Sequence, residues 1–330
     1  PGLDFDFSYD QGGNRTGTSF AGNALNQMTQ RPVSDSVFIH VEAECATDVL
    51  INQEAVVPSA SGLFTKEITV DNGSSAYWDS VRVVSAETND VEYELEEHDI
   101  FVPKGPESFA FDDDGYLTSD GRFSYEWDTA GNLTSMTTLS GMPQDMPRQK
   151  LVFQYDSQGR RRTKEVYDKV GSSFVLSTTT KYFYDGWNLL EERITDEATS
   201  TTTINRFVWG KDISGSVHGA AGVGGLVLIE LDGDVYFPIP DGNGNIRALV
   251  DNTGTVQAEY EYGPFGEPVR ASGPVAAANP MRFSTRYLDR ETGHYYFGLR
   301  YYSPPLGTWL CRDPMGESGG ANLYAYCGND

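Results

Sequence analysis

The chain has 330 residues, and its 48 acidic against 24 basic residues give a formal net charge of -24. A phosphate-binding face needs clustered Lys and Arg, so this balance argues against nucleic acid and anionic membranes as partners. No apolar run reaches the roughly 20 residues that span a bilayer, so we expect no membrane insertion. Three cysteines (Cys45, Cys311 and Cys327) and four histidines lack metal-ligand spacing, which argues against a disulfide framework, a metal site or a cofactor.

Residues 1–32 introduce a recurring phrase, in which an aromatic residue and an acidic residue precede a turn with Gly. "FSYDQGGNRT" is followed later by "FAFDDDGYLT", "YEWDTAGNLT", "FQYDSQGRRR" and "YFYDGWNLLE". A phrase that recurs indicates architecture, since an active site is built only once. The chain starts inside such a phrase and shows no export signal, so we expect a fragment of a longer protein.

Each phrase has the chemistry of a β-hairpin turn. The aromatic residue can stack on its equivalent on a neighbouring strand, the acid can accept backbone N–H bonds across the turn, and the Gly supplies a positive φ angle. The aromatic members are Tyr9, Phe111, Trp127, Tyr155 and Tyr184, and the acids are Asp10, Asp112, Asp128, Asp156 and Asp185. One hairpin cannot bury its apolar face alone, so the copies are predicted to associate sideways into a curved sheet of an all-β protein.

Residues 33–104 break this pattern. Runs that alternate apolar and acidic residues, such as "FIHVEAE" and "VEYELEE", predict strands with one solvated face. We interpret the stretch as an inserted small β-sandwich of the immunoglobulin-like kind. Between Val33 and Gly105 it has 15 acidic and 3 basic residues, a local charge of -12, without the spacing of a calcium loop. Tyr77 and Trp78 are candidate ligand-binding aromatics, with core packing as the alternative.

The hairpin phrases resume at residue 105 and run to residue 270, and residues 271–330 form a separate C-terminal part. The densest basic run, Arg160–Arg162 with Lys164, follows a Gly turn and is predicted as a solvated strand end. In the C-terminal part, runs of strand-forming residues over 282–289, 294–303 and 308–312 predict a three-stranded meander.

Three longer segments resemble the RHS or YD-repeat proteins and their C-terminal RHS-repeat-associated core. They are "RFVWGKDISGSVHGAAGVGGLVLIE", "FPIPDGNGNIRALVDNTGTVQAEYEYGPFGEP" and "RFSTRYLDRETGHYYFGLRYYSPPLGTWLCRDPMGESGGANLYAYCGND". The resemblance covers about residues 1–32 and 105–330. It implies a long sheet that winds spirally into a hollow shell, which in bacterial relatives encloses a C-terminal toxin. Teneurin-like surface proteins are similar and use a related barrel for adhesion.

The resemblance also implies a candidate catalytic pair. In some relatives two aspartates of the core cleave the chain after a DPxG motif. By position these are Asp289 in "YLDRETG" and Asp313 in "CRDPMG", with Arg282 as a residue that could tune them, and the scissile bond would be Glu317–Ser318. Two adjacent carboxylates cannot both ionise easily, so one can hold a proton while the other activates water. The activity would be at most a single self-cleavage.

The residues themselves leave another interpretation open, in which Asp313 caps a turn before a proline and Asp289 begins the turn after its strand. Counting strand pairs places Asp289 opposite His294 and Asp313 opposite Gly298, an offset of about 13 Å along the strands. The pair therefore meets only if the last strand folds back. Glu317 also stands where the motif of the relatives ends in an apolar residue, so we expect no efficient cleavage.

Three functions remain open at this level. The first is a structural shell segment that encapsulates or displays a C-terminal domain, with the rest of the same shell and that domain as partners. The second is an adhesive or filament-forming surface module that binds a glycan or protein and associates with itself. The third is an aspartyl autoprotease that releases a C-terminal toxin. We expect an extracellular or cell-surface location.

Overall fold

The computed structural model describes residues 8–11, 14–16, 20–42, 48–59, 63–86 and 93–327. Their secondary structure is β apart from two short 3₁₀ segments, η1 (Phe283–Thr285) and η2 (Gly316–Gly319). The predicted all-β class is thereby confirmed. Within the described residues, no helix is long and apolar enough to cross a membrane.

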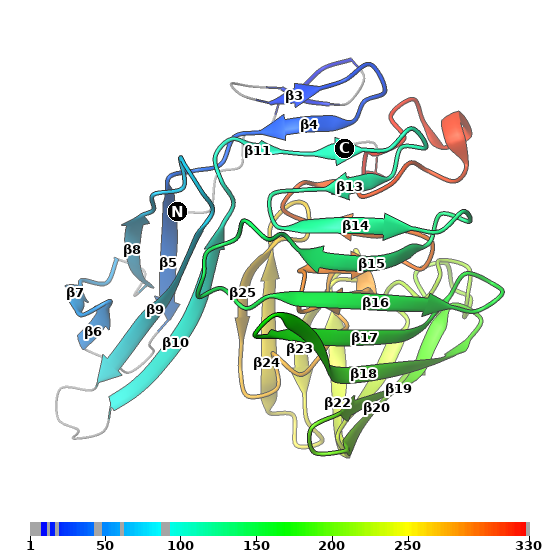
Figure 1. Cartoon of the computed structure of the whole chain (residues 1–330). Helices are drawn as coiled ribbons and strands as arrows, with labels where there is room; N and C mark the ends of the chain where they lie inside the picture. Colours follow the sequence, from blue (N-terminus) through cyan, green and yellow to red (C-terminus); the bar gives the residue numbers. More distant parts are fainter. Residues whose placement is uncertain are drawn as a thin grey trace.

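Fourteen consecutive strands form the largest sheet, and each pairs antiparallel with the next one along the chain. In order they are β12 (Ala110–Phe111), β13 (Leu117–Ser119), β14 (Phe123–Trp127), β15 (Leu133–Thr138), β16 (Gln149–Tyr155), β17 (Arg161–Val170), β18 (Ser173–Asp185), β19 (Asn188–Asp196), β20 (Thr201–Trp209), β21 (Leu226–Leu231), β22 (Asp234–Pro240), β23 (Ile246–Val250), β24 (Val256–Tyr262) and β25 (Pro268–Ser272). Figure 1 shows the sheet curling until β23–β25 lie behind β15–β17. The curl brings Leu117 near one end and Tyr260 near the other into one buried cluster. This is the curved sheet of hairpins that the repeats predict.

The repeat turns are held by the predicted carboxylate mechanism. The Oδ1 atom of Asp128 accepts the backbone N–H groups of Ala130 (2.8 Å) and Asn132 (2.9 Å), and Gly131 has a φ angle of 84°. The same bonding recurs in the turns that follow Asp156, Asp241 and Asp251. The copy at Asp185 differs, because Asp185 pairs with Asn188 across a two-residue turn.

The aromatic residues before these acids do not stack on one another as predicted. Among the described residues, no ring contact joins any two of Phe111, Trp127, Tyr155 and Tyr184. Equivalent positions of successive hairpins are two strands apart, about 10 Å, which is too far for ring stacking. Each ring packs against the core cluster instead. Two of them also donate to a main-chain carbonyl of the preceding strand, Trp127 Nε1 to Leu117 at 2.7 Å and Tyr155 Oη to Leu133 at 2.8 Å.

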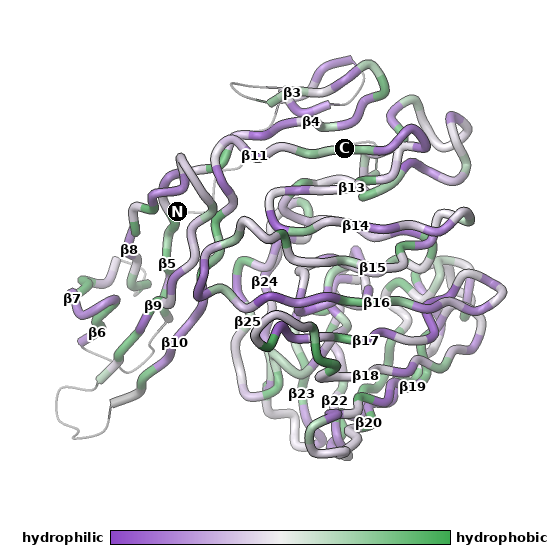
Figure 2. The backbone as a smooth tube through the Cα atoms, in the orientation of Figure 1, coloured by the Kyte–Doolittle hydropathy of each residue, from purple (hydrophilic) through white to green (hydrophobic). Residues whose placement is uncertain are grey.

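Two further sheets lie within residues 33–104. One pairs β5 (Ser36–Glu42) with β8 (Leu63–Thr69), and the other has the order β10 (Tyr93–Val102), β9 (Tyr77–Ala86), β6 (Asp48–Ile51), β7 (Glu54–Val56). Both sheets contribute to one small core that contains Ile51, Phe64 and Val83, as expected where two sheets pack face to face. Figure 2 shows polar residues along much of β10.

The ends of this stretch are tied together, since Asn72 Nδ2 donates to the carbonyls of Ser34 and Pro103, both at 3.0 Å. Tyr77 and Trp78 are half-buried, and Trp78 lies opposite Phe101 of β10. Their role in binding a ligand stays a prediction. The division into residues 1–32, 33–104, 105–270 and 271–330 as separate domains stays a prediction.

The chain before residue 33 lies beside the chain after residue 104. β1 (Ser8–Tyr9) pairs with β2 (Arg15–Thr16), and β3 (Ala21–Gly22) and β4 (Met28–Arg31) form a sheet with β11 (Glu107–Ser108). The side chains of Arg31 and Glu107 form an ion pair of 2.5 Å across this contact. β11 then leads into β12, so the first hairpins continue the direction of the large sheet.

The C-terminal part contains four strands, not the predicted three. They are β26 (Tyr287–Asp289), β27 (His294–Tyr296), β28 (Tyr301–Ser303) and β29 (Thr308–Trp309), in that order in one antiparallel sheet. The predicted strand over 294–303 is broken by a turn at Gly298, whose φ angle of 93° suits glycine. Residues 283–285 form η1 in place of the predicted start of a strand.

Both faces of this four-stranded sheet are buried. Tyr287, Tyr296 and Tyr301 join the core cluster of the large sheet. The alternate residues, among them Tyr295 and Tyr302, pack into a second cluster with Phe265 and Phe283. The C-terminal part therefore fills the concave side of the large sheet, as the orange strands behind β14–β16 in Figure 1 show.

Candidate functional site

The concave side of the fourteen-stranded sheet is occupied by the chain's own C-terminal part. We call β12–β25 the wall, residues 273–327 the C-terminal core, and their contact surface the seam. Apolar side chains of both, such as Leu151 of the wall and Leu310 of the core, share the largest buried cluster. The seam also holds buried charges, which are costly unless they are paired.

Arg161 of the wall and Asp289 of the core form the central ion pair of the seam. Arg161 is 0% exposed and Asp289 is 1% exposed, and Nη1 lies 2.5 Å from Oδ2. Lys164 Nζ binds the other oxygen of Asp289 at 2.9 Å and Glu291 at 2.9 Å. Two cations thus meet two carboxylates, and the cluster is neutral as a unit.

The predicted solvated strand end is wrong for Arg161 and Lys164, which are both buried. The register between β16 and β17 shifts at Tyr155, which leaves one residue of β17 without a partner. Such a bulge interrupts the alternation of faces, so two residues three positions apart both face the core. Arg162 between them is exposed. The same register shift occurs at the repeat aromatics Trp127 and Tyr184, so the aromatic position of the repeat phrase is the sequence signal for this bulge.

Aromatic rings enclose the Arg161 guanidinium. Its Cζ atom lies 4.6 Å from the ring centre of Tyr296, 4.7 Å from Tyr182 and 5.0 Å from Tyr287. Rings at these distances attract a cation through their quadrupole, most strongly where water is absent. The ring of Tyr182 comes from the wall and the other two come from the core, so the cation is held from both sides of the seam.

Tyrosine hydroxyls of the core add hydrogen bonds to the wall. Tyr287 Oη donates to Glu192 at 2.7 Å, and Tyr296 Oη accepts the backbone N–H of Arg161 at 2.7 Å. Tyr301 Oη lies 3.1 Å from Tyr155 Oη. Each core strand that carries such a tyrosine is therefore fixed to a particular wall strand.

Electrostatics keep Asp289 ionised. Burial alone would raise its pKa, but the charges of Arg161 and Lys164 outweigh burial and hold the pKa below the ordinary value. Glu192 is the opposite case, because burial raises its pKa although Asn205 and Tyr287 donate hydrogen bonds to it. A carboxylate clamped by two cations is suited to docking and is a poor source of protons.

The structure gives the three predicted catalytic residues separate partners. Asp313 Oδ2 pairs with Arg300 Nη2 at 2.9 Å, and Asp313 Oδ1 accepts the backbone N–H of Met315 at 2.8 Å, as a turn cap does. Arg282 donates to main-chain carbonyls of residues 276 and 279. Among the described residues, Asp289, Asp313 and Arg282 share no hydrogen bond or ion pair with one another.

The strand register separates the two aspartates further. Asp289 pairs with His294 at one end of the four-stranded sheet, while Leu310 binds Tyr301 at the other end. Asp313 follows three residues beyond Leu310 on that far side. Glu317 and Ser318 lie in η2 and are exposed. The catalytic pair stays a prediction.

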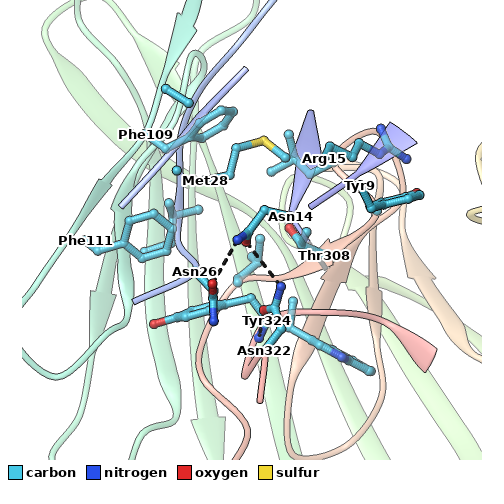
Figure 3. A pocket seen from close by; sticks show the side chains of 17 residues that line it. Tyr9, Asn14, Arg15, Asn26, Met28, Phe109, Phe111, Thr308, Asn322 and Tyr324 are labelled. Atoms are coloured by element: carbon cyan, nitrogen blue, oxygen red, sulfur yellow. Dashed lines mark hydrogen bonds between the residues drawn. The ribbon is translucent and has the colours of Figure 1, made fainter. Parts of the chain in front are cut away.

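A second contact joins the C-terminal core to the N-terminal hairpins. Figure 3 shows a small pocket between them, with a volume of about 30 Å³. In it Asn14 Nδ2 donates to Asn26 Oδ1 at 2.8 Å, and Asn322 Nδ2 donates to Asn14 Oδ1 at 3.2 Å. Gln27 Nε2 donates to Tyr324 Oη at 2.8 Å. The two ends of the described chain therefore meet at this corner.

Comparison with known proteins agrees with this architecture. The family profile described as Teneurin YD-shell matches residues 77–321, which is most of the chain. The chain belongs to this family. The YD-shell match confirms the resemblance to RHS or YD-repeat proteins, and it begins at Tyr77, within the stretch that we interpret as an insertion.

The YD-shell chain is 32% identical over 229 residues to the tRNA nuclease WapA of Bacillus subtilis, a match that covers 68% of the chain and 9% of WapA. Over 52 residues it is 48% identical to the toxin protein Tse5 of Pseudomonas aeruginosa, covering 16% of the chain and 4% of Tse5. The YD-shell chain thus spans a small part of the relatives it matches.

Solved structures show the same fold. The crystal structure of TcdB2-TccC3 aligns with 98% of the YD-shell chain and 17% of its own, with a TM-score of 0.54 and 18% identity. The stacked hairpins, the family match and this likeness together make the chain a structural shell segment. The seam is the surface on which the wall of the YD shell binds its own C-terminal core, through the shared apolar cluster and the Arg161–Asp289 ion pair.

Proposed function

We propose that this shell segment belongs to a toxin protein of the cell surface or extracellular space and encloses a domain that follows the C-terminal core. One observation carries the proposal: the wall already holds a polypeptide on its concave side, namely the C-terminal core. The core is anchored there by the Arg161–Asp289 pair, which has no access to solvent. The family is described as a YD-shell, and two relatives are named as a toxin protein and a toxin subunit, which supports a shell that belongs to a toxin.

The charged seam supports a locking role for this anchor. A buried charge that loses its partner is strongly destabilising, whereas an apolar contact tolerates sliding. Lys164 and Arg161 can satisfy their charges only when Asp289 and Glu291 reach them. One register of the core on the wall is thereby favoured, and the chain that leaves the core starts from a defined place.

Limited proteolysis of the natural gene product, extended past residue 330, tests the enclosure. We expect trypsin to spare the following domain while the shell is folded and to digest it once the shell is unfolded in urea. The variant Asp289→Ala should expose the domain, whereas Glu230→Gln, which removes a partly exposed partner of Arg206, should not. Equal digestion of the domain with the shell folded and unfolded would contradict enclosure.

A further inference from the structure

A second cavity on the seam is large and lined by aromatic rings. Its volume is about 220 Å³, which exceeds the roughly 150 Å³ of an engineered cavity that binds benzene. The wall contributes Tyr184, Trp187 and Trp209, and the core contributes Tyr287, Tyr296 and Phe297. The space is therefore wide enough for a ring, and its walls suit edge-to-face and stacked ring contacts.

The cavity reaches solvent at the end of the strands. Trp187, in the two-residue turn between β18 and β19, is 39% exposed, and Leu299, in the turn between β27 and β28, is 58% exposed. A Cβ atom on Gly298 would lie 3.0 Å from the indole of Trp187, so the two turns touch directly. A ligand can therefore enter beside this contact, past the exposed side chains of Trp187 and Leu299, without opening the seam.

Arg286 lines the cavity, and the protein satisfies its guanidinium only in part. Its Nη1 atom donates to the carbonyl of Ala221 at 2.9 Å, but its buried Nε atom has no acceptor. Among the described residues, Arg286 makes no ion pair, although its guanidinium lies 5.2 Å from the ring centre of Phe297. Burying a cation without an anionic partner is costly, so this guanidinium, which lines the cavity, points to a polar partner that a ligand supplies.

The backbone beside Arg286 is strained. Ser284 and Thr285 have φ angles of 50° and 53°, a region that a β-branched residue rarely occupies. Thr285 is held there by its hydroxyl, which donates to the carbonyl of Gly244 at 2.6 Å and accepts the N–H of Gly224 at 2.8 Å. Strain of this kind is concentrated at ligand sites, where the surrounding structure maintains it. Arg286 follows this segment directly, and its guanidinium lies over the ring of Phe297.

From this combination we infer that the cavity binds an aromatic residue of the enclosed polypeptide, with its ring between Trp187 and Trp209 and its main-chain carbonyl on Arg286. The inference rests on the proposed enclosure. A neutral carbonyl suits the site better than a free carboxylate, because a chain of formal charge -24 repels anions at a distance. A main-chain carbonyl accompanies every side chain, so a polypeptide supplies the ring and the acceptor together.

The test is a ligand-observed NMR titration of the 330-residue chain with N-acetyl-phenylalanine methylamide. We expect saturable binding, and at least tenfold weaker binding of N-acetyl-leucine methylamide. Trp187→Ala and Arg286→Met should each weaken binding at least tenfold. Phe237→Ala is the matched control, because Phe237 is also 39% exposed but does not line the cavity. If Arg286→Met fails to fold, Trp187→Ala, in an exposed turn, decides alone.

Three outcomes would overturn the inference. They are the absence of saturable binding, equal binding of the leucine compound, and tighter binding of N-acetyl-phenylalanine with its free carboxylate, which would indicate a small aromatic acid. Failure of the cavity to bind the aromatic compound can be distinguished from failure of the shell to enclose the following domain. Trp187→Ala leaves the Arg161–Asp289 anchor intact, so protection of the following domain from trypsin is measured separately.

Discussion

Arg161 and Asp289 are 128 positions apart in the sequence and form an ion pair of 2.5 Å with almost no exposure to solvent. The pair joins β17, the sixth strand of the wall, to β26, the first strand of the C-terminal core. Because Lys164 and Glu291 complete the cluster, the contact depends on four charges meeting at once. The stability and the assembly of the shell segment should both respond to it.

Removing the carboxylate of this pair should destabilise the chain strongly. Asp289→Ala leaves Arg161 buried without its carboxylate and Lys164 with Glu291 alone, and breaking a buried pair in this way costs about 3–5 kcal/mol. Urea unfolding measures the loss. Glu230→Gln, at the partly exposed pair with Arg206, should cost less than about 1 kcal/mol. Equal losses for the two variants would show that the seam charges do not stabilise the core.

Stability should fall as the pH is lowered from 7 to 4, with His294 as a main cause. Burial lowers the pKa of His294 from 6.5 to about 4. The unfolded chain then binds more protons than the folded chain between these values, so the contribution is complete above pH 6.5 and is lost as the pH falls toward 4. Below the ordinary pKa of aspartate, protonation of Asp289 adds a further loss.

The pH dependence is measured by urea unfolding of the unmodified chain and two variants. His294→Gln should remove up to about 3 kcal/mol of the difference between pH 7 and pH 4. His98→Gln, at an exposed histidine, is the matched control and should remove less of the difference than His294→Gln does. A His294→Gln profile that parallels that of the unmodified chain would contradict the assignment.

Truncating a repeat aromatic should weaken the wall. Trp127→Ala or Tyr155→Ala removes a ring that packs on the core and a hydrogen bond to the preceding strand, which should cost about 2–4 kcal/mol. Phe237→Ala, at an exposed ring on β22, serves as the control and should cost less than about 1 kcal/mol. Equal losses at the three positions would rule out a special role for the repeat aromatics.

The stretch from Val33 to Val102 should be removable. Asn72 binds the carbonyls of both Ser34 and Pro103, so the two ends lie close enough for a short Gly-Ser bridge. The shortened chain should still unfold cooperatively, followed by near-UV circular dichroism during thermal melting. Loss of cooperative unfolding would show that the stretch is part of the wall.

We expect no efficient self-cleavage at Glu317–Ser318. Asp289 and Asp313 have separate cationic partners, and a third carboxylate at Glu317 would crowd any shared pocket with like charge. The intact mass of the natural gene product, extended past residue 330, measures cleavage. A fragment ending at Glu317 that disappears in Asp313→Asn would establish the aspartate pair and refute this expectation.

The repeat turns could be predicted from the sequence because the residues that stabilise each turn are neighbours in the chain. The carboxylate of Asp128 binds the N–H groups of Ala130 and Asn132, residues two and four positions away, and Gly131 supplies the positive φ angle. Every partner lies within one phrase of the sequence. The all-β class and the sideways association of hairpins follow from such turns, since each hairpin leaves an apolar face that only a neighbour can cover.

Side-chain contacts between repeats could not be predicted in the same way. The aromatic residues recur at one position of each phrase, which suggests stacking, but that position is two strands from its next copy. Gly298 is a similar case, because the run from His294 to Ser303 looks continuous and the turn within it requires the core to double back. A periodic pattern shows which residues are equivalent and does not show how far apart they lie.

The sequence by itself therefore determined the repeat hairpins, the curved sheet and the membership of the shell family. Only the tertiary structure decided that Arg161 and Lys164 are buried, that they hold Asp289, and that Asp313 lies on the far side of its sheet. The reason is that a single bulge in β17 reverses the face on which a side chain lies. The partner of each buried cation is then set by the C-terminal core, which folds back onto wall strands that lie more than a hundred residues earlier in the sequence.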